Sequence, residues 1–560
     1  MQNNQPDTPP SGNGAPGEQP SGADVVHTGA TVFSDSTTET GQSYSSTTGG
    51  ENALLAVNGE STVTNPTVTK SGDESSENSD FYGTNAAVLA TDGVLTLDGG
   101  SVKTDGAHAN AVFAYTLGKI VVKNTTISTS GNNSGALMVT MGGTLEATNV
   151  TAETFGNSSA PIRSDRGGGT LTVSGGSFTS HGTGSPAIYS TADVRVENNA
   201  VLTSTASEGI VIEGNNSVTL DTVTLTDTNT TLNGNSETYK NIFIYQSMSG
   251  DASEGTGTFS AKNSTITTNQ GDTFFVTNTT ATINLDNNKI INNDINSALL
   301  RAGAGKWGNA GSNGGHVDFI LANQVAEGDL IADSVSSIYL ALSNSSFYMG
   351  VINGANTAQN VEVVLDDTSQ LILAGDSYIS SLTNADKENK NIYGNGYKLY
   401  VNGSEVAING SEAPTAPEVT FYAETETEEV VAETAATVCK ETFFTDCSGN
   451  VKLPILVGGA AIIVIIIAII AFALHGKKKK GPATPGSGAN NMTPPAPGNA
   501  RPDFSALDST PAPAPTPTPA TQPKPPVQPQ QPPVQPAQPA QPAQPAQPTQ
   551  PPRPPLVGQM

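Results

Sequence analysis

Short apolar strands alternate with tight polar turns along this chain from residue 94 onward. Asn or Gly occupies the turn in seven of eight copies, and both residues tolerate the left-handed backbone of a sharp turn. The copies are 23–26 residues apart, except for one interval of 41 that indicates an insertion. A fixed period with β-rich units predicts an all-β solenoid, here a right-handed parallel β-helix with coils of about 24 residues. The turn positions are Gly99, Asn124, Asn149, Gly175, Asn198, Thr222, Asn263 and Asn287.

A second set of strands, upstream of each turn, supports the same register. Side chains alternate between the two faces of a strand, so one residue in each copy points inward and stacks on its equivalents. This inward stack is predicted to contain Val88, Val112, Leu137, Ile162, Ile188, Ile210, Ile242 and Phe274. The strand just before the turn predicts a second stack of Val94, Ile120, Leu145, Leu171, Val194, Val218 and Ile283. Both stacks are mostly aliphatic, as a narrow all-β core requires.

The residues between the inward positions are predicted to face outward, and several are aromatic. Coils of a β-helix stack about 4.8 Å apart, so these side chains form a continuous apolar stripe. Exposed stripes mark binding surfaces, and aromatic faces stack on sugar rings or protein partners. The alternative is that a loop or the N-terminal arm covers the stripe. The candidate ligand-binding residues are Phe113, Tyr115, Tyr189, Phe243, Tyr245 and Phe275.

Composition divides the chain into five segments. Residues 1–50 are rich in Pro, Gly, Ser and Thr, and we expect them to be disordered. The β-helix is expected over residues 51–411, with larger side chains near its end forming a cap, and a Thr/Glu-rich stalk follows over 412–452. Residues 453–474 are predicted to form a transmembrane helix. Residues 475–560 combine a Lys cluster with a disordered, Pro-rich tail.

The membrane prediction depends on length and flanking charge. Residues 453–474 are a run of 22 without a charge, which is long enough to cross a bilayer as a helix. Four lysines, Lys477 to Lys480, follow the run, whereas Lys452 alone precedes it. The positive-inside rule predicts a single-pass plasma-membrane protein with its N-terminal part outside and its tail in the cytoplasm. The first 20 residues lack the features of a signal peptide, so we expect an upstream start or an unusual export signal.

Charge excludes one class of partner. The chain has 51 acidic and 24 basic side chains, a formal net charge of −27. Seven of the basic groups lie after residue 452, so the first 452 residues carry 49 acidic and only 17 basic side chains. A surface this acidic repels nucleic acids, so no nucleic-acid binding is expected. No cofactor or metal site is predicted.

Two short features flank the predicted membrane segment. Cys439 and Cys447 lie just outside it and form a juxtamembrane disulfide in an oxidising compartment, or remain two free thiols. In the tail, Pro548, Pro551 and Arg553 fit the PxxPxR form that SH3-type domains bind. The tail would then contact an SH3-type or cytoskeletal adaptor; the alternative is a Pro-rich spacer that matches by chance.

A long parallel β-helix resembles the pectin-lyase-like superfamily, which includes polysaccharide lyases and hydrolases. The resemblance implies clustered carboxylates beside a basic residue on an outward strand face. Arg163, Asp165 and Arg166 are the catalytic candidates, with Asp193 and Arg195 one coil later. The simpler interpretation is a surface salt-bridge cluster, because no stacked Asp pair accompanies these residues.

A β-helix on a stalk outside a membrane also resembles adhesin-type surface proteins, including autotransporter passengers and polymorphic-membrane-protein-like solenoids. This likeness covers residues 51–411. It implies a non-enzymatic, adhesin-like protein that binds a glycan or protein ligand of a host or neighbouring cell. A surface polysaccharide lyase or glycoside hydrolase is the first alternative, and a structural coat protein is the second.

Overall fold

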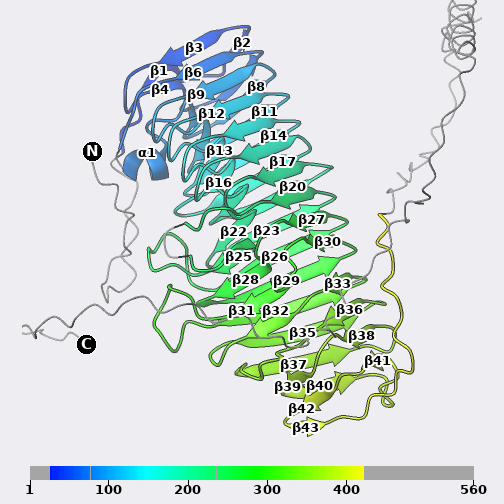
Figure 1. Ribbon diagram of the computed structural model, residues 1–560. Helices are drawn as coiled ribbons and strands as arrows, with labels where there is room; N and C mark the ends of the chain where they lie inside the picture. The colour runs from blue at the N-terminus through cyan, green and yellow to red at the C-terminus, as the bar shows by residue number, and fades with distance from the viewer. Residues whose placement is uncertain (1–24, 76, 234–235, 422–560) are drawn as a thin grey trace, which may run out of the picture. The chain divides into compact units, whose positions relative to one another are not determined.

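The chain forms a parallel β-helix, which a computed structural model describes over residues 25–75, 77–233 and 236–421 (Figure 1). Each regular coil contributes one strand to each of three parallel sheets, which we call sheets A, B and C. The winding is consistent with the right-handed helix that the sequence predicts. Described helix is confined to one short element, α1 (Glu77–Tyr82).

Sheet A has 12 strands, paired in sequence order along the β-helix. They are β1 (Gly29–Phe33), β4 (Asn52–Ala56), β7 (Val88–Ala90), β10 (Val112–Tyr115), β13 (Leu137–Thr140), β16 (Ile162–Ser164), β19 (Ile188–Ser190), β22 (Ile210–Glu213), β25 (Lys240–Tyr245), β28 (Asp272–Thr277), β31 (Leu300–Ala302) and β34 (Leu330–Ala332).

Sheet B has 14 strands and runs almost the full length of the β-helix. They are β2 (Thr38–Thr40), β5 (Glu60–Thr64), β8 (Val94–Asp98), β11 (Lys119–Lys123), β14 (Gly143–Thr148), β17 (Gly169–Ser174), β20 (Asp193–Glu197), β23 (Ser217–Asp221), β26 (Thr256–Lys262), β29 (Thr279–Asp286), β32 (Gly315–Ala322), β35 (Ser337–Ser343), β37 (Asn360–Leu365) and β40 (Ser381–Asn384).

Sheet C has 10 strands. They are β3 (Ser43–Ser46), β6 (Thr67–Lys70), β9 (Ser101–Thr104), β12 (Thr126–Thr129), β15 (Thr151–Thr154), β18 (Ser177–Ser180), β21 (Val201–Ser204), β24 (Thr224–Asp227), β27 (Thr265–Thr268) and β30 (Lys289–Asn292).

Two small sheets complete the C-terminal coils. The first has four strands: β33 (Val325–Glu327), β36 (Phe347–Gly350), β38 (Gln370–Leu373) and β41 (Ile392–Tyr393). The second has three: β39 (Ser377–Ile379), β42 (Leu399–Val401) and β43 (Ser404–Glu405). Among the described strands, only β42 and β43 pair antiparallel, and this pair lies where the β-helix ends. The regular strands therefore stop close to the predicted end at residue 411.

The tight turns predicted from the sequence join sheet B to sheet C. All eight predicted turn residues have a positive φ, from 48° at Asn263 to 77° at Gly99. Asn65, Asn323 and Asn344 extend the same column of turns in both directions. Only Gly and a few polar residues adopt this left-handed conformation readily, which explains why the turn, and not the strands, carries the visible repeat.

The predicted inward stack of sheet A is confirmed. Its eight members, from Val88 to Phe274, are register partners in successive strands and are fully buried. The stack of sheet B is confirmed except at its first member, because Leu95 pairs with Ile120 while Val94 pairs with Lys119. The prediction at Val94 is therefore wrong by one residue, and Leu95 is the inward residue of this coil. A shift of one residue moves a side chain to the other face of a strand.

The β-helix begins earlier than predicted. Strands β1, β2 and β3 form a complete first coil within the segment expected to be disordered, and they pair with β4, β5 and β6. The prediction for residues 1–50 is therefore wrong over 29–46. The inward positions of β1 before Phe33 are Gly29 and Thr31, whereas the apolar Val32 faces outward and is 48% exposed, so the core contribution of this coil is small, mainly Phe33 and Tyr44. A strand with so few apolar residues gives a weak period-2 signal.

Several predictions fall on residues that the structure does not describe. These are the transmembrane segment 453–474, both cysteines, the Lys cluster and the Pro-rich tail. Within the described parts of residues 25–421, no helix is long and apolar enough to cross a membrane. Of the predicted stalk, residues 412–421 are described, and the carbonyl of Thr420 accepts a hydrogen bond from Asn287 Nδ2 at 3.1 Å.

The corner between sheets C and A contains a buried charged cluster. Lys240 Nζ forms a 3.0 Å ion pair with Glu208, and both side chains are buried. Asp227, at the end of β24, is fully buried. Burial raises the pKa of Asp227 to about 9, with a further increase from the negative charge of Glu208. Asp227 is therefore protonated in the folded protein at neutral pH.

This protonation predicts a pH-dependent stability. The pKa of Asp227 is 3.8 in the unfolded chain and about 9 in the folded protein. At pH values between these two, Asp227 releases its proton only when the protein unfolds, so its contribution to the free energy of unfolding falls as the pH rises. Asp227→Asn mimics the protonated acid and removes this loss. We expect nearly equal melting temperatures for wild type and variant at about pH 4, and a gain of several degrees for the variant at about pH 8. Exposed Asp367→Asn is the control; a variant less stable than wild type at both pH values would contradict the assignment.

Candidate functional site

The outward residues of sheet A form one continuous ladder, as the sequence predicts. Each member is a register partner of the next. In order, the ladder contains Leu89, Phe113, Met138, Arg163, Tyr189, Val211, Phe243, Phe275 and Arg301.

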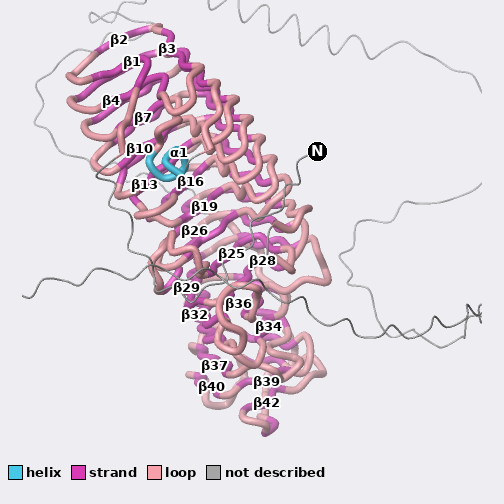
Figure 2. The backbone as a smooth tube through the Cα atoms, turned by 90° about the vertical axis from the view of Figure 1, so that its left-hand side faces the viewer, coloured by secondary structure: helices cyan, strands magenta, loops and turns pink. Residues whose placement is uncertain are grey.

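Helix α1 covers the first half of this ladder (Figure 2). The ring of Tyr82 packs edge-on against Tyr115, with a centroid distance of 5.8 Å. Thr140 Oγ1 donates a 2.7 Å hydrogen bond to the carbonyl of Phe81, which fixes the end of the helix to sheet A. Phe113 is consequently fully buried and Tyr115 nearly so. The prediction that these two side chains are exposed is wrong, because a helix supplies the cover.

A loop covers the second half of the ladder. Trp307 packs against Phe243 and Tyr245 at centroid distances of 5.4 and 5.1 Å. Phe243 is 3% exposed, Phe275 6% and Tyr245 9%. The exposed stripe is therefore absent, and the alternative of a covered stripe is confirmed. Of the six candidate ligand-binding residues, Tyr189 and Tyr245 line a cleft.

The two covers leave a gap over the middle of the ladder, which we call the face cleft. It has a volume of about 340 Å³ and lies where Arg163 and Tyr189 pair across β16 and β19. Asp80 and Phe81 of α1 border it on one side, and Asp251 of the loop between β25 and β26 borders it on another. Its other lining residues are Asn133, Ser158, Ala160, Asp165, Gly184, Asn233 and Tyr245.

Of the predicted catalytic candidates, Arg163 and Asp165 line the face cleft, and Arg166 pairs with Asp251, which also lines it. Arg163 Nη2 donates to Asp165 Oδ2 at 2.9 Å, and its Nη1 donates to the carbonyl of Ser158 at 3.1 Å. Arg166 Nε pairs with Asp251 Oδ1, and its guanidinium lies 3.7 Å above the ring of Phe81. Both arginines therefore form ion pairs, and these pairs are largely buried rather than on an open surface.

The residues predicted one coil later do not join this cluster. Arg195 pairs with Glu197 and Asp221 of sheet B. Asp193 accepts a 2.6 Å hydrogen bond from the hydroxyl of Ser217 and lines a different cleft. The turn between sheets A and B separates these side chains from Arg163.

A buried carboxylate lies beneath the tyrosines of the face cleft. Glu213 accepts hydrogen bonds from Tyr189 Oη at 2.6 Å and Tyr245 Oη at 3.0 Å, and also from Ser247 Oγ. Burial raises the pKa of Glu213, while the three hydroxyl donors oppose this shift. Ser247 belongs to the same loop as Asp251, so Glu213 connects the cleft floor to that loop.

The carboxyl of Asp165 has an unusual acidity. Burial raises the pKa of Asp165 to about 6, although the charge and hydrogen bond of Arg163 oppose the shift. The negative charge of Asp251 adds to the increase. A carboxyl that titrates close to neutral pH suits proton transfer to or from a bound molecule.

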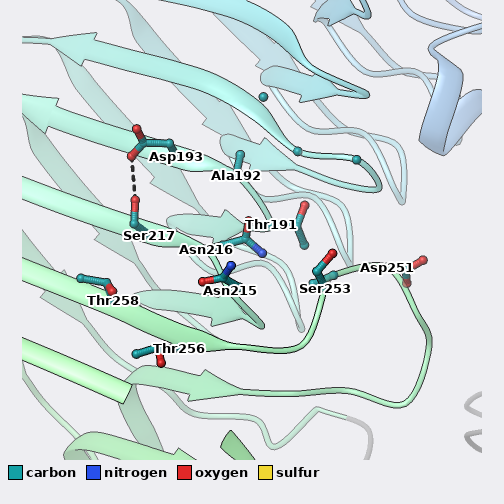
Figure 3. A pocket seen from close by; sticks show the side chains of 14 residues that line it. Thr191, Ala192, Asp193, Asn215, Asn216, Ser217, Asp251, Ser253, Thr256 and Thr258 are labelled. Atoms are coloured by element: carbon teal, nitrogen blue, oxygen red, sulfur yellow. Dashed lines mark hydrogen bonds between the residues drawn. The ribbon is translucent and has the colours of Figure 1, made fainter. Parts of the chain in front are cut away.

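A second cleft adjoins the first at the corner between sheets A and B, and we call it the corner cleft (Figure 3). Its volume is about 540 Å³. The coil of β19 and β20 turns this corner with only two residues, whereas the loop between β25 and β26 is much longer and borders the recess. The lining is formed by Gly167, Gly168, Gly169, Thr191, Ala192, Asp193, Asn215, Asn216, Ser217, Asp251, Ala252, Ser253, Thr256 and Thr258.

The corner cleft is polar, and Thr191, one of its lining residues, has a buried hydroxyl. Thr191 is 2% exposed, and its Oγ1 makes no hydrogen bond within the described protein. Gly168 has a φ of 59°, and a Cβ there would lie 2.8 Å from the carbonyl oxygen of Thr191. Only glycine fits at this position, which leaves the backbone of the wall open. Asp251 lines both clefts.

Sequence reasoning missed Glu213, Asp251 and Thr191. The 41-residue interval between Thr222 and Asn263 was the available signal, because this insertion supplies the loop that contains Asp251. Among the described residues, no group of three or more His, Cys, Asp or Glu side chains is arranged to hold a metal ion.

Comparisons with protein-family models, with curated proteins and with solved structures find no match for this chain.

Proposed function

We propose that this chain is a single-pass surface protein whose β-helix binds an extracellular glycan across the corner cleft and the face cleft. The polar lining of the corner cleft is the observation that carries this proposal. Hydroxyl, amide and carboxylate groups surround a recess walled in part by bare glycine backbone, and sugar hydroxyls donate to and accept from such groups. In the face cleft, Tyr189 offers an aromatic ring beside the same region.

A glycan fits this region better than a protein ligand does. Protein interfaces depend on a few large aromatic or apolar anchors in the centre of the contact. On sheet A those side chains lie beneath α1 and Trp307, so they are unavailable to a partner. In the proposed adhesin-like function, the binding surface is therefore the two polar clefts and not the aromatic stripe predicted from the sequence.

Membrane anchoring is the second part of the proposal. The uncharged run 453–474 and the lysines that follow it support a β-helix outside the plasma membrane and a cytoplasmic tail. Pro548, Pro551 and Arg553 would then be accessible to an SH3-type adaptor. Antibody labelling of an epitope in the loop 246–255 on intact cells tests the orientation, and labelling only after permeabilisation would refute it.

Thr258→Val tests the glycan site without disturbing the fold. Thr258 lies in β26, is half-buried and lines the corner cleft, and the substitution removes its hydroxyl while keeping the shape of the side chain. Loss of one hydrogen bond to the ligand should weaken glycan binding by about 3- to 10-fold, measured by calorimetry, with little change in thermal stability. Thr282→Val is a matched control, because Thr282 is the register partner of Thr258 in β29 and is also half-buried, but does not line the corner cleft. Equal affinities of the two variants would exclude Thr258 from the site.

Glycan cleavage is a second candidate function, favoured by the acidity of Asp165. A carboxyl with a pKa of about 6 can act as a general acid, while Asp251 and Glu213 lie in the same charged cluster. Asp165→Asn should then lower turnover of the bound glycan by about 10²- to 10⁴-fold with little change in affinity. Asp367→Asn is the control. If the wild-type protein binds glycan but releases no shorter product, cleavage is excluded and the adhesin-like function remains. A coat protein would show neither glycan binding nor glycan cleavage.

A further inference from the structure

A further recess lies on the outward face of sheet B, and we call it the sheet B recess. Its volume is about 270 Å³, and strands β29, β32, β35 and β37 form its floor. Ile338, between two of its lining side chains, belongs to the buried core, so the recess is a hollow in the outer surface of the sheet. Its outward side chains include Thr280, His316, Asp318, Ser337, Tyr339 and Glu362.

Tyr339 lies between two carboxylates on this surface. Asp318 in β32, Tyr339 in β35 and Glu362 in β37 are successive register partners, so they form one outward row across three strands. Tyr339 is half-buried, and both carboxylates are exposed. Glu362 accepts a 2.9 Å hydrogen bond from Asn360 Nδ2, whereas Asp318 and the Tyr339 hydroxyl have no hydrogen-bond partner among the described residues. The row therefore presents an aromatic ring with carboxylate oxygens on both sides.

An apolar row runs beside Tyr339. Ile320, Ala341 and Val364 are register partners in the same three strands, and each is half-buried. A sugar ring has a similar division, with C–H groups on its faces and hydroxyl groups around its rim. Its faces pack against aromatic and apolar side chains, and its hydroxyls donate to carboxylate oxygens. The sheet B recess is therefore suited to a sugar ring stacked on Tyr339.

The sheet B recess continues the corner cleft along the β-helix. Thr256 lines the corner cleft and Thr280 lines the sheet B recess, and these two threonines are register partners in β26 and β29. Both side chains are exposed, and no coil lies between them. Figure 3 shows Thr256 and Thr258 at one border of the corner cleft, and Figure 1 shows the strands of the recess following in order along sheet B. One ligand can therefore occupy both.

The distance between the two ends of this surface sets the length of such a ligand. Asp193 of the corner cleft lies in β20 and Tyr339 lies in β35, and sheet B places β23, β26, β29 and β32 between them. Five inter-strand steps of about 4.8 Å amount to about 24 Å. A disaccharide is too short to reach both ends, whereas an extended hexasaccharide reaches them.

We propose that the corner cleft and the sheet B recess form one extended site for a linear, neutral polysaccharide, which lies parallel to the β-helix axis with one sugar ring stacked on Tyr339. The inference rests on the proposed glycan binding and adds the length, direction and charge class of the ligand. The sugar chain must be extended, because the strands follow one another in register and a coiled chain would leave this surface. A polyanionic chain is excluded, because Asp193, Asp318 and Glu362 would repel it.

Oligosaccharides of two lengths test this inference on the full chain. Cello-, xylo-, manno- and chito-oligosaccharides are extended and neutral, and each series is titrated as its disaccharide and its hexasaccharide. We expect a series that binds to do so at least about tenfold more tightly as the hexasaccharide, because only the longer chain also stacks on Tyr339. Maltohexaose, which coils, and a galacturonic acid hexamer should show no such gain over their disaccharides. A gain for either of these, or equal affinity of disaccharide and hexasaccharide, overturns the extended site alone. Absence of binding in every series overturns the proposed glycan binding as well.

Variants of Tyr339 locate the gain within the site. Tyr339→Ala removes the ring, so the hexasaccharide should bind about fivefold to tenfold more weakly, while the disaccharide in the corner cleft binds wild type and variant alike. Tyr339→Phe keeps the ring and should retain most of the gain. Tyr397→Ala is the control, because Tyr397 is 44% exposed but lines neither the corner cleft nor the sheet B recess. If Tyr339→Ala binds the hexasaccharide as tightly as Tyr397→Ala does, Tyr339 does not contact the ligand and the proposal fails.

Discussion

Each coil of this β-helix can bury its apolar side only against the coils beside it. The whole structure therefore depends on register between successive parallel strands. The turn residues from Gly99 to Asn287 maintain that register, because each forces the same sharp bend between sheets B and C. With the bend fixed, the inward stacks of sheets A and B follow, and the outward residues of sheet A must form a ladder.

The candidate functional site lies where this regularity is broken. The coils share strand positions but differ in the length of their connections, and the loop between β25 and β26 is longer than its neighbours. A long loop beside a two-residue corner creates the corner cleft, and the gap between α1 and the Trp307 loop creates the face cleft. A rigid scaffold with variable loops is a common way to position a binding site.

The same covers explain the electrostatics of the candidate site. By excluding water from sheet A, they raise the pKa values of Asp165 and Glu213 and strengthen the ion pairs of both arginines. A charged cluster on an open β-helix face would be screened and have little effect. Here the ion-paired side chains are only 7–21% exposed, so solvent screens them less.

The sequence by itself determined the fold class, the period, the turn column and nearly all of the inward stacks, because these are local properties repeated in every coil. It also located Arg163, Asp165 and Arg166 as a cluster. It did not reveal that α1 and Trp307 bury Phe113 and Phe243, or that Asp251 and Glu213 join the arginines. Those contacts link residues up to 85 positions apart through loops without a repeat, and only tertiary packing decides where such loops lie.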